Sequence, residues 1–209
     1  MSGASDYAAN AFGRWLTGQQ PMPVLPAIWM GLFATVPSDA NVGGVELNGN
    51  GYARAQIAGQ AATSANTASG TVLTFASVPS WVAIGMSVFD ASAEDAIVSG
   101  QTVAAIDTTA NTVTLNAAID ASVVSGDLIA FSAFGAPAGS APSVFVNIAD
   151  VFFPVTTGPQ GTASGFGFFD AASGGNLIDS DVLAGGAQVI GGPNFQPRFV
   201  AGQISIIIN

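Results

Sequence analysis

Apolar residues in this sequence come in short runs, and Gly, Ser, Thr, Asn or Pro interrupts them every few positions. A helix that crosses a membrane needs about 18 or more apolar residues without such breaks. Short runs rich in β-branched and aromatic side chains are instead typical of strands divided by turns. The pattern therefore predicts an all-β protein that does not insert into a membrane.

The clearest strand signal lies in residues 27–57. Residues 27–35 are an apolar run of strand length, and residues 36–40 supply Pro, Ser and Asp as a break. After a loop rich in Gly and Asn, residues 49–57 restart the chain as a second strand. We interpret this stretch as a buried strand, a polar loop and a returning strand.

One helix is predicted, over residues 6–16. Ser5 suits the N-cap, Asp6 is favourable at the positive end of the helix, and Gly18 ends it. The apolar residues that share one face at helical spacing are Ala8, Phe12, Trp15 and Leu16. That face can pack on the chain's own sheet or on a neighbouring subunit, and the sequence leaves both open.

The remaining strand signals form two groups. After a connector of small residues (58–70), short β runs divided by Gly, Asp and Asn continue to residue 134, and strand-like runs resume after a Gly- and Pro-rich loop. We therefore expect a main β-sandwich or barrel-like body, residues 1–65 and 135–209, which carries the short N-terminal helix. A small β module, residues 66–134, is inserted into it.

Charge is scarce in this chain. Charged residues make up 8% of it, against about 25% in an average protein, and the cations are Arg14, Arg54 and Arg198. A surface this poor in charge aggregates unless copies of the chain or a neighbour cover it. The net charge of −10 repels phosphate backbones, so we expect no contact with nucleic acid. Assembly is the first functional inference.

The residue types of common catalytic sites are missing. Without His, Cys or Lys, the chain has no Ser-His-Asp, Cys-His or Ser-Lys site. Two carboxylate pairs of the kind that hydrolyse sugars remain: Glu94 with Asp95, and Asp179 with Asp181. Most acids lie beside Gly, Ser or Asn, which is typical of solvated turns. We expect no enzyme and no cofactor.

Oxygen-bearing side chains gather in the loop after residue 35, where they could suit Ca²⁺. The weak metal candidates are Asp39, Asn41 and Glu46. The spacing is not that of an EF-hand, and an ordinary Asx-rich loop explains the pattern equally, so we expect no metal site.

Two further features point to an interface. Residues 203–208 form a very apolar strand, which needs a sheet interior or a subunit interface. Arg54 is a cation in an acidic chain and will pair with a carboxylate, either within the chain or across an interface. The expected interface residues are Phe12, Trp15, Leu16, Arg54, Ile204, Ile206 and Ile208.

Three blocks resemble structural proteins of tailed-bacteriophage virions. They read F-x-T-x-P-S-D-A with G-N-G-Y-A-R (residues 33–40 and 49–54), G-F-F-D-A-A-S-G-G-N-L-I (167–178) and F-V-A-G-Q-I-S-I-I-I (199–208). Residues 71–134 are also similar to a β module of phage tail fibres. The resemblance covers most of the chain and contains no catalytic motif.

The resemblance implies a homotrimeric virion protein on the particle exterior. We expect a capsid decoration (cement) protein, because an acidic surface suits a face turned away from DNA and the length leaves no room for a long shaft. The alternative is a tail-fibre or receptor-binding subunit. The implied partners are further copies of the chain, the major capsid protein or other virion proteins and, for a receptor binder, a host-surface glycan.

Overall fold

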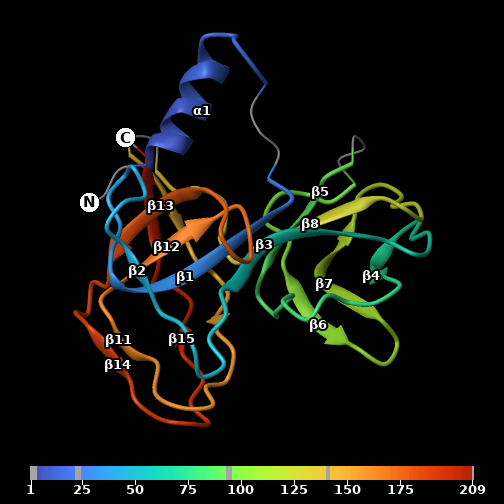
Figure 1. The fold of residues 1–209 in the computed structure, drawn as a ribbon. Helices are drawn as coiled ribbons and strands as arrows, with labels where there is room; N and C mark the ends of the chain where they lie inside the picture. Colours follow the sequence, from blue (N-terminus) through green and yellow to red (C-terminus); the bar gives the residue numbers. More distant parts are fainter. Residues whose placement is uncertain (1–3, 22–24, 93–95, 140–141, 209) are drawn as a thin grey trace. The chain divides into compact units, whose positions relative to one another are not determined.

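A computed structural model gives the fold and describes residues 4–21, 25–92, 96–139 and 142–208. These residues form several antiparallel sheets and one short helix, with no closed barrel among them (Figure 1). The predicted all-β class with a short N-terminal helix is confirmed. The chain divides into two compact units: unit 1 is Met1–Ile57 with Phe152–Arg198, and unit 2 is Ala58–Val151 with Phe199–Asn209.

Unit 1 holds the helix and a sheet. Its elements are α1 (Asp6–Leu16), β1 (Ala27–Thr35), β2 (Val45–Glu46), β11 (Gly161–Ala163), β12 (Gly165–Phe169), β13 (Leu177–Val182) and β14 (Gln188–Ile190). Strands β13, β12 and β1 are neighbours in that order, β2 pairs with β1, and β11 pairs with β14. A buried cluster of Phe33, Phe169 and Leu177, with Trp29 packed against it, forms part of the core.

Unit 2 contains three groups of paired strands. Its strands are β4 (Gly70–Thr74), β5 (Ser87–Asp90), β6 (Val103–Asp107), β7 (Thr112–Ile119), β8 (Leu128–Ser132), β9 (Ser143–Val146), β16 (Ser205–Ile208) and most of β3 (Ala55–Ala62). The pairings are β3-β8-β5, β4-β7-β6 and β9-β16. The rings of Phe75 and Trp81 both pack on Phe131, which is fully buried. Two further short strands, β10 (Val151–Phe152) and β15 (Arg198–Phe199), pair with each other.

Local signals located α1 and β1 correctly. Both elements have the predicted bounds, and the Ser5 hydroxyl accepts a hydrogen bond from the backbone N–H of Ala8 at 3.2 Å. Gly18 follows the helix with a φ of +70°, a conformation that glycine adopts without a steric penalty.

Three predictions about where strands and connectors lie were wrong. Residues 49–52 form a turn with positive φ at Asn50 and Gly51, so the returning strand starts later, at Ala55. Residues 58–62 are not a connector but the second half of β3, paired with β8 through backbone hydrogen bonds that need no large side chains. Residues 96–98, one of the short apolar runs expected to be strands in the predicted module, form no strand.

The two units have different bounds from the two bodies expected from the sequence. Unit 2 takes in residues 58–65, 135–151 and 199–209 as well as the expected module. That residues 66–134 form a small module inserted into a main body of residues 1–65 and 135–209 stays a prediction.

Candidate functional site

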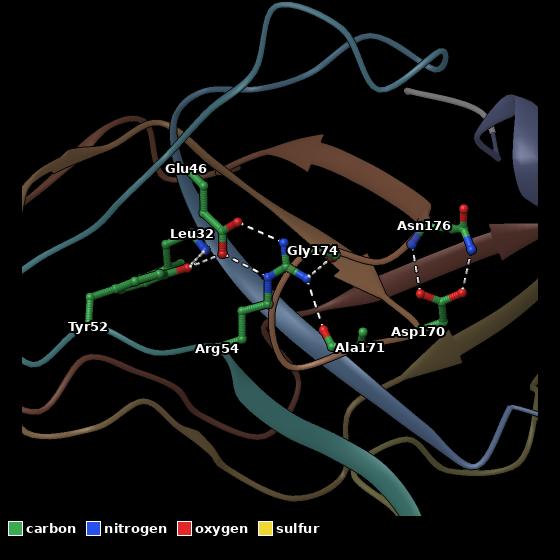
Figure 2. Close-up of polar contacts among 8 residues, drawn as sticks. All are labelled: Leu32, Glu46, Tyr52, Arg54, Asp170, Ala171, Gly174 and Asn176. Atoms are coloured by element: carbon green, nitrogen blue, oxygen red, sulfur yellow. Dashed lines mark hydrogen bonds and ion pairs between the residues drawn. The ribbon is translucent and has the colours of Figure 1, made fainter.

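Arg54 lies in a buried polar cluster of unit 1 (Figure 2). Its Nε and Nη2 atoms donate to the two carboxylate oxygens of Glu46 at 2.8 and 2.7 Å, a two-pronged ion pair. Nη1 donates to the backbone carbonyls of Ala171 and Gly174, at 2.9 and 2.8 Å. The guanidinium carbon also lies 3.4 Å from the centre of the Phe169 ring. Arg54 thus meets its carboxylate within the chain.

Tyr52 completes the cluster. Its hydroxyl donates to Glu46 Oε1 at 2.9 Å and accepts from the Leu32 backbone N–H at 2.8 Å. Burial, and then the nearby Glu46 carboxylate, raise the pKa of Tyr52 far above its usual range. Gly31 leaves room for this contact, since a Cβ there would lie 2.8 Å from Glu46 Oε1.

The cluster holds the turn between β12 and β13. The Asp170 carboxylate accepts from the backbone and side-chain nitrogens of Asn176, both at 2.7 Å, while Arg54 binds the carbonyls on the other side of the same turn. Residues 49–54 and 167–178, two blocks far apart in the sequence, therefore meet at Arg54. The cluster therefore ties these two blocks of unit 1 together.

The turn leads into β13, the strand to which α1 is attached. The Ser5 backbone N–H donates to the Ile178 carbonyl at 3.0 Å, and the Ser5 hydroxyl donates to the Leu177 carbonyl. The Asp6 N–H donates to the Asp39 carbonyl at 2.9 Å. These contacts all lie at the first residues of the helix.

The rest of α1 presents apolar side chains to solvent. None of its residues is buried, and the three that we call the apolar stripe are 49% (Phe12), 46% (Trp15) and 68% (Leu16) exposed. The rings of Phe12 and Trp15 lie 5.5 Å apart. Figure 1 shows the end of α1 pointing away from the strands of unit 1. In the described structure no strand buries this face, and its packing on a neighbouring subunit stays a prediction.

The C-terminal strand is only partly exposed. Ile204 is buried in the chain itself, Ile206 is half-buried, and neighbouring Ile207 is 43% exposed. Ile208 belongs to β16, and its side chain lies outside the described structure. The strand is not in a sheet interior, because it pairs only with β9 in a two-stranded sheet of the described chain.

Asn147 supports this strand and was missed by sequence reasoning. It is buried, its carbonyl oxygen accepts from the Ile204 N–H at 2.8 Å, and its amide donates to the Ala149 and Val200 carbonyls. A lone Asn between apolar residues carries no pattern that could have pointed to this role. The predicted interface roles of Arg54, Ile204, Ile206 and Ile208 stay predictions.

The three metal candidates lie in different local environments. Glu46 is committed to Arg54 and Tyr52, Asn41 has a positive φ, and Asp39 is exposed. The described residues hold no group of three or more His, Cys, Asp or Glu side chains that could bind a metal ion.

The structure describes one of the two predicted acid pairs. Asp179 and Asp181 oppose Phe168 and Phe166 across β13 and β12. Each carboxylate accepts a hydrogen bond from the next backbone N–H. The pair of Glu94 and Asp95 falls outside the described residues.

A family model described as "Podophage GP4 fiber I protein gp80" matches residues 3–128, more than half of the chain. A search of curated proteins finds no match. In the part of the chain that the structure describes, no helix has the length and apolar character needed to span a membrane.

Proposed function

Because the chain belongs to the family of the podophage GP4 fiber I protein gp80, and is thus a structural fibre protein of a phage virion, we propose that it works by assembly through exposed apolar surfaces. The observation that carries this proposal is the apolar stripe of α1. Aromatic side chains in the core of this chain are almost wholly buried, as for Phe33 and Phe169, whereas Phe12 and Trp15 are about half exposed on one short helix. Exposed apolar patches of this kind mark interaction sites.

Within the virion, we propose that the protein decorates the exterior of the head as a cement protein. The net charge of −10 supports a place away from the packaged DNA, whose phosphates would repel it. The partners in this arrangement are the major capsid protein and other copies of the chain.

A second candidate is a tail-fibre or receptor-binding subunit, which the description of the family as a fibre protein favours. Its partner would be a glycan of the host surface. Purified protein should then adsorb to host cells and compete with phage particles, whereas a cement protein should protect heads against heat when added back.

Labelling of intact virions with an antibody against the purified protein tests the location. Label in many copies over the head supports decoration. Label confined to the tail or its tip overturns decoration and favours the receptor-binding candidate. Absence of label from the whole particle overturns both.

We further propose a homotrimer, as the resemblance to virion proteins implies. Sedimentation equilibrium of the chain should give three times its mass of 20.7 kDa. A mass of two or four chains would overturn the homotrimer, but it would leave the proposed location in the virion unaffected.

A further inference from the structure

Two asparagines in the loop between β2 and β3 each precede a glycine: Asn48 before Gly49, and Asn50 before Gly51. Asparagine is among the thermolabile residues. It loses its amide when the backbone nitrogen of the next residue attacks its side-chain carbonyl carbon. A glycine at that next position favours the attack, because it has no Cβ to hinder the approach. The two pairs share one sequence but have different surroundings.

Asn50 is held through both its side chain and its main chain. Its Nδ2 donates to the Pro159 carbonyl. Its own carbonyl accepts from the Thr157 N–H at 2.8 Å and from Gln160 Nε2 at 3.2 Å. A Cβ at Gly158 would lie 3.0 Å from Asn50 Oδ1, so this amide packs closely on the neighbouring backbone. Rotation of the amide towards the next backbone nitrogen would break these side-chain contacts.

Asn48 has no comparable restraint. It is exposed, and in the described part of the chain no hydrogen bond holds its side chain or the Gly49 N–H. Gly49 is exposed as well, and a Cβ built there would meet nothing within 4 Å. The Asn48 amide is therefore free to turn towards the Gly49 nitrogen, and water has access to both residues.

We propose that Asn48 is a site of spontaneous deamidation in the folded protein and that the fold protects Asn50 from the same reaction. The Gly49 nitrogen forms a bond to Cγ of Asn48, the bond from Cγ to Nδ2 breaks, and the proton of the Gly49 N–H leaves with the amide nitrogen as ammonia. Water then opens the succinimide ring at either carbonyl, which gives aspartate or isoaspartate. Each product adds a carboxylate to a chain whose net charge is already −10. The inference depends neither on assembly nor on a place in the virion.

The test is incubation of the full chain at mildly alkaline pH, where the attacking nitrogen loses its proton more readily. Tryptic digestion and tandem mass spectrometry follow. Both asparagines lie in the peptide between Arg14 and Arg54, so fragment ions are needed to tell them apart. In the folded chain, most of Asn48 should be converted while Asn50 stays largely intact. In urea, where the contacts of Asn50 are lost, the two should react at similar rates.

Two variants complete the experiment. Asn48→Asp carries the added charge from the start, so the aged wild-type chain should move to its position in ion-exchange chromatography. Asn48→Gln is the matched control, because its longer side chain keeps the amide but closes the larger ring far less readily, and it should keep both amides when folded.

Three outcomes would overturn the proposal. In the folded chain, Asn50 could react as fast as Asn48, or Asn48 could stay intact under conditions in which both react in urea. The third outcome is an Asn50 that stays intact in urea as well, because its protection would then come from the local sequence and not from the contacts with Pro159 and Gly158.

Discussion

Two arginines of this chain lie in opposite environments. Arg54 is buried on the ring of Phe169, with Glu46 and two carbonyls as partners. Arg14 is exposed in the last turn of α1, without an ion pair in the described structure. In a chain with three cations, one therefore joins two segments of unit 1 and another is exposed to solvent. The comparison predicts that the two arginines contribute very differently to stability.

The largest expected effect is at the buried arginine. Arg54→Ala should lower the free energy of unfolding by about 3 kcal/mol, because it leaves Glu46 without its cation and two carbonyls without donors. Urea unfolding measures the change. Arg14→Ala, measured as a monomer, should change stability by less than about 0.5 kcal/mol. Equal losses in the two variants would end the distinction between the two arginines.

A glycine next to the Arg54 cluster offers the next test. In Gly31→Ala the new Cβ would lie 2.8 Å from Glu46 Oε1 and 3.3 Å from the Tyr52 hydroxyl, so the cluster has to shift. We expect a loss of about 2 kcal/mol, typical of overpacking, in thermal or urea unfolding. An unchanged free energy of unfolding would contradict the close packing of Gly31 against Glu46 and Tyr52.

Tyr52→Phe removes one hydroxyl and leaves the Leu32 N–H without its acceptor. The expected loss is about 1–2 kcal/mol near neutral pH. The raised pKa of Tyr52 also predicts a pH dependence: the tyrosine releases its proton more readily in the unfolded chain, so stability is complete below about pH 10 and falls as the pH rises above it.

Urea unfolding at several alkaline pH values, with Tyr52→Phe as the comparison, separates this tyrosine from Tyr7, which is exposed. The variant should lose less stability than wild type between neutral and alkaline pH. Parallel curves for the two proteins would contradict the link to Tyr52.

The smallest effect is expected in the helix. A Cβ at Gly13 meets nothing within 4 Å, and Ala is favoured over Gly in a helix by about 0.8–1 kcal/mol. Gly13→Ala should therefore raise the helical signal in circular dichroism and strengthen association, with little change in the unfolding of unit 1. Gly18→Ala is the matched control, because its φ of +70° disfavours alanine and should weaken the helix end.

Some structure could be predicted because its causes are local. The bounds of α1 follow from Ser5 and Gly18, and β1 follows from one apolar run. The second half of β3 could not be predicted in this way, since its small side chains become a strand only through pairing with β8. The same limit applies to Asn147, whose partners Ile204 and Val200 are distant in sequence.

The same distinction between local and long-range causes holds for the candidate site. The sequence by itself determined the all-β class, the position of α1, the apolar stripe and the scarcity of cations, since these depend on residue type and spacing alone. Only the tertiary structure decided that Arg54 pairs with Glu46 and binds carbonyls 117 and 120 residues away, and that no strand of unit 1 buries Phe12, Trp15 and Leu16. The physical reason is that a side chain's partners are set by long-range packing, which brings together segments that have no local relation.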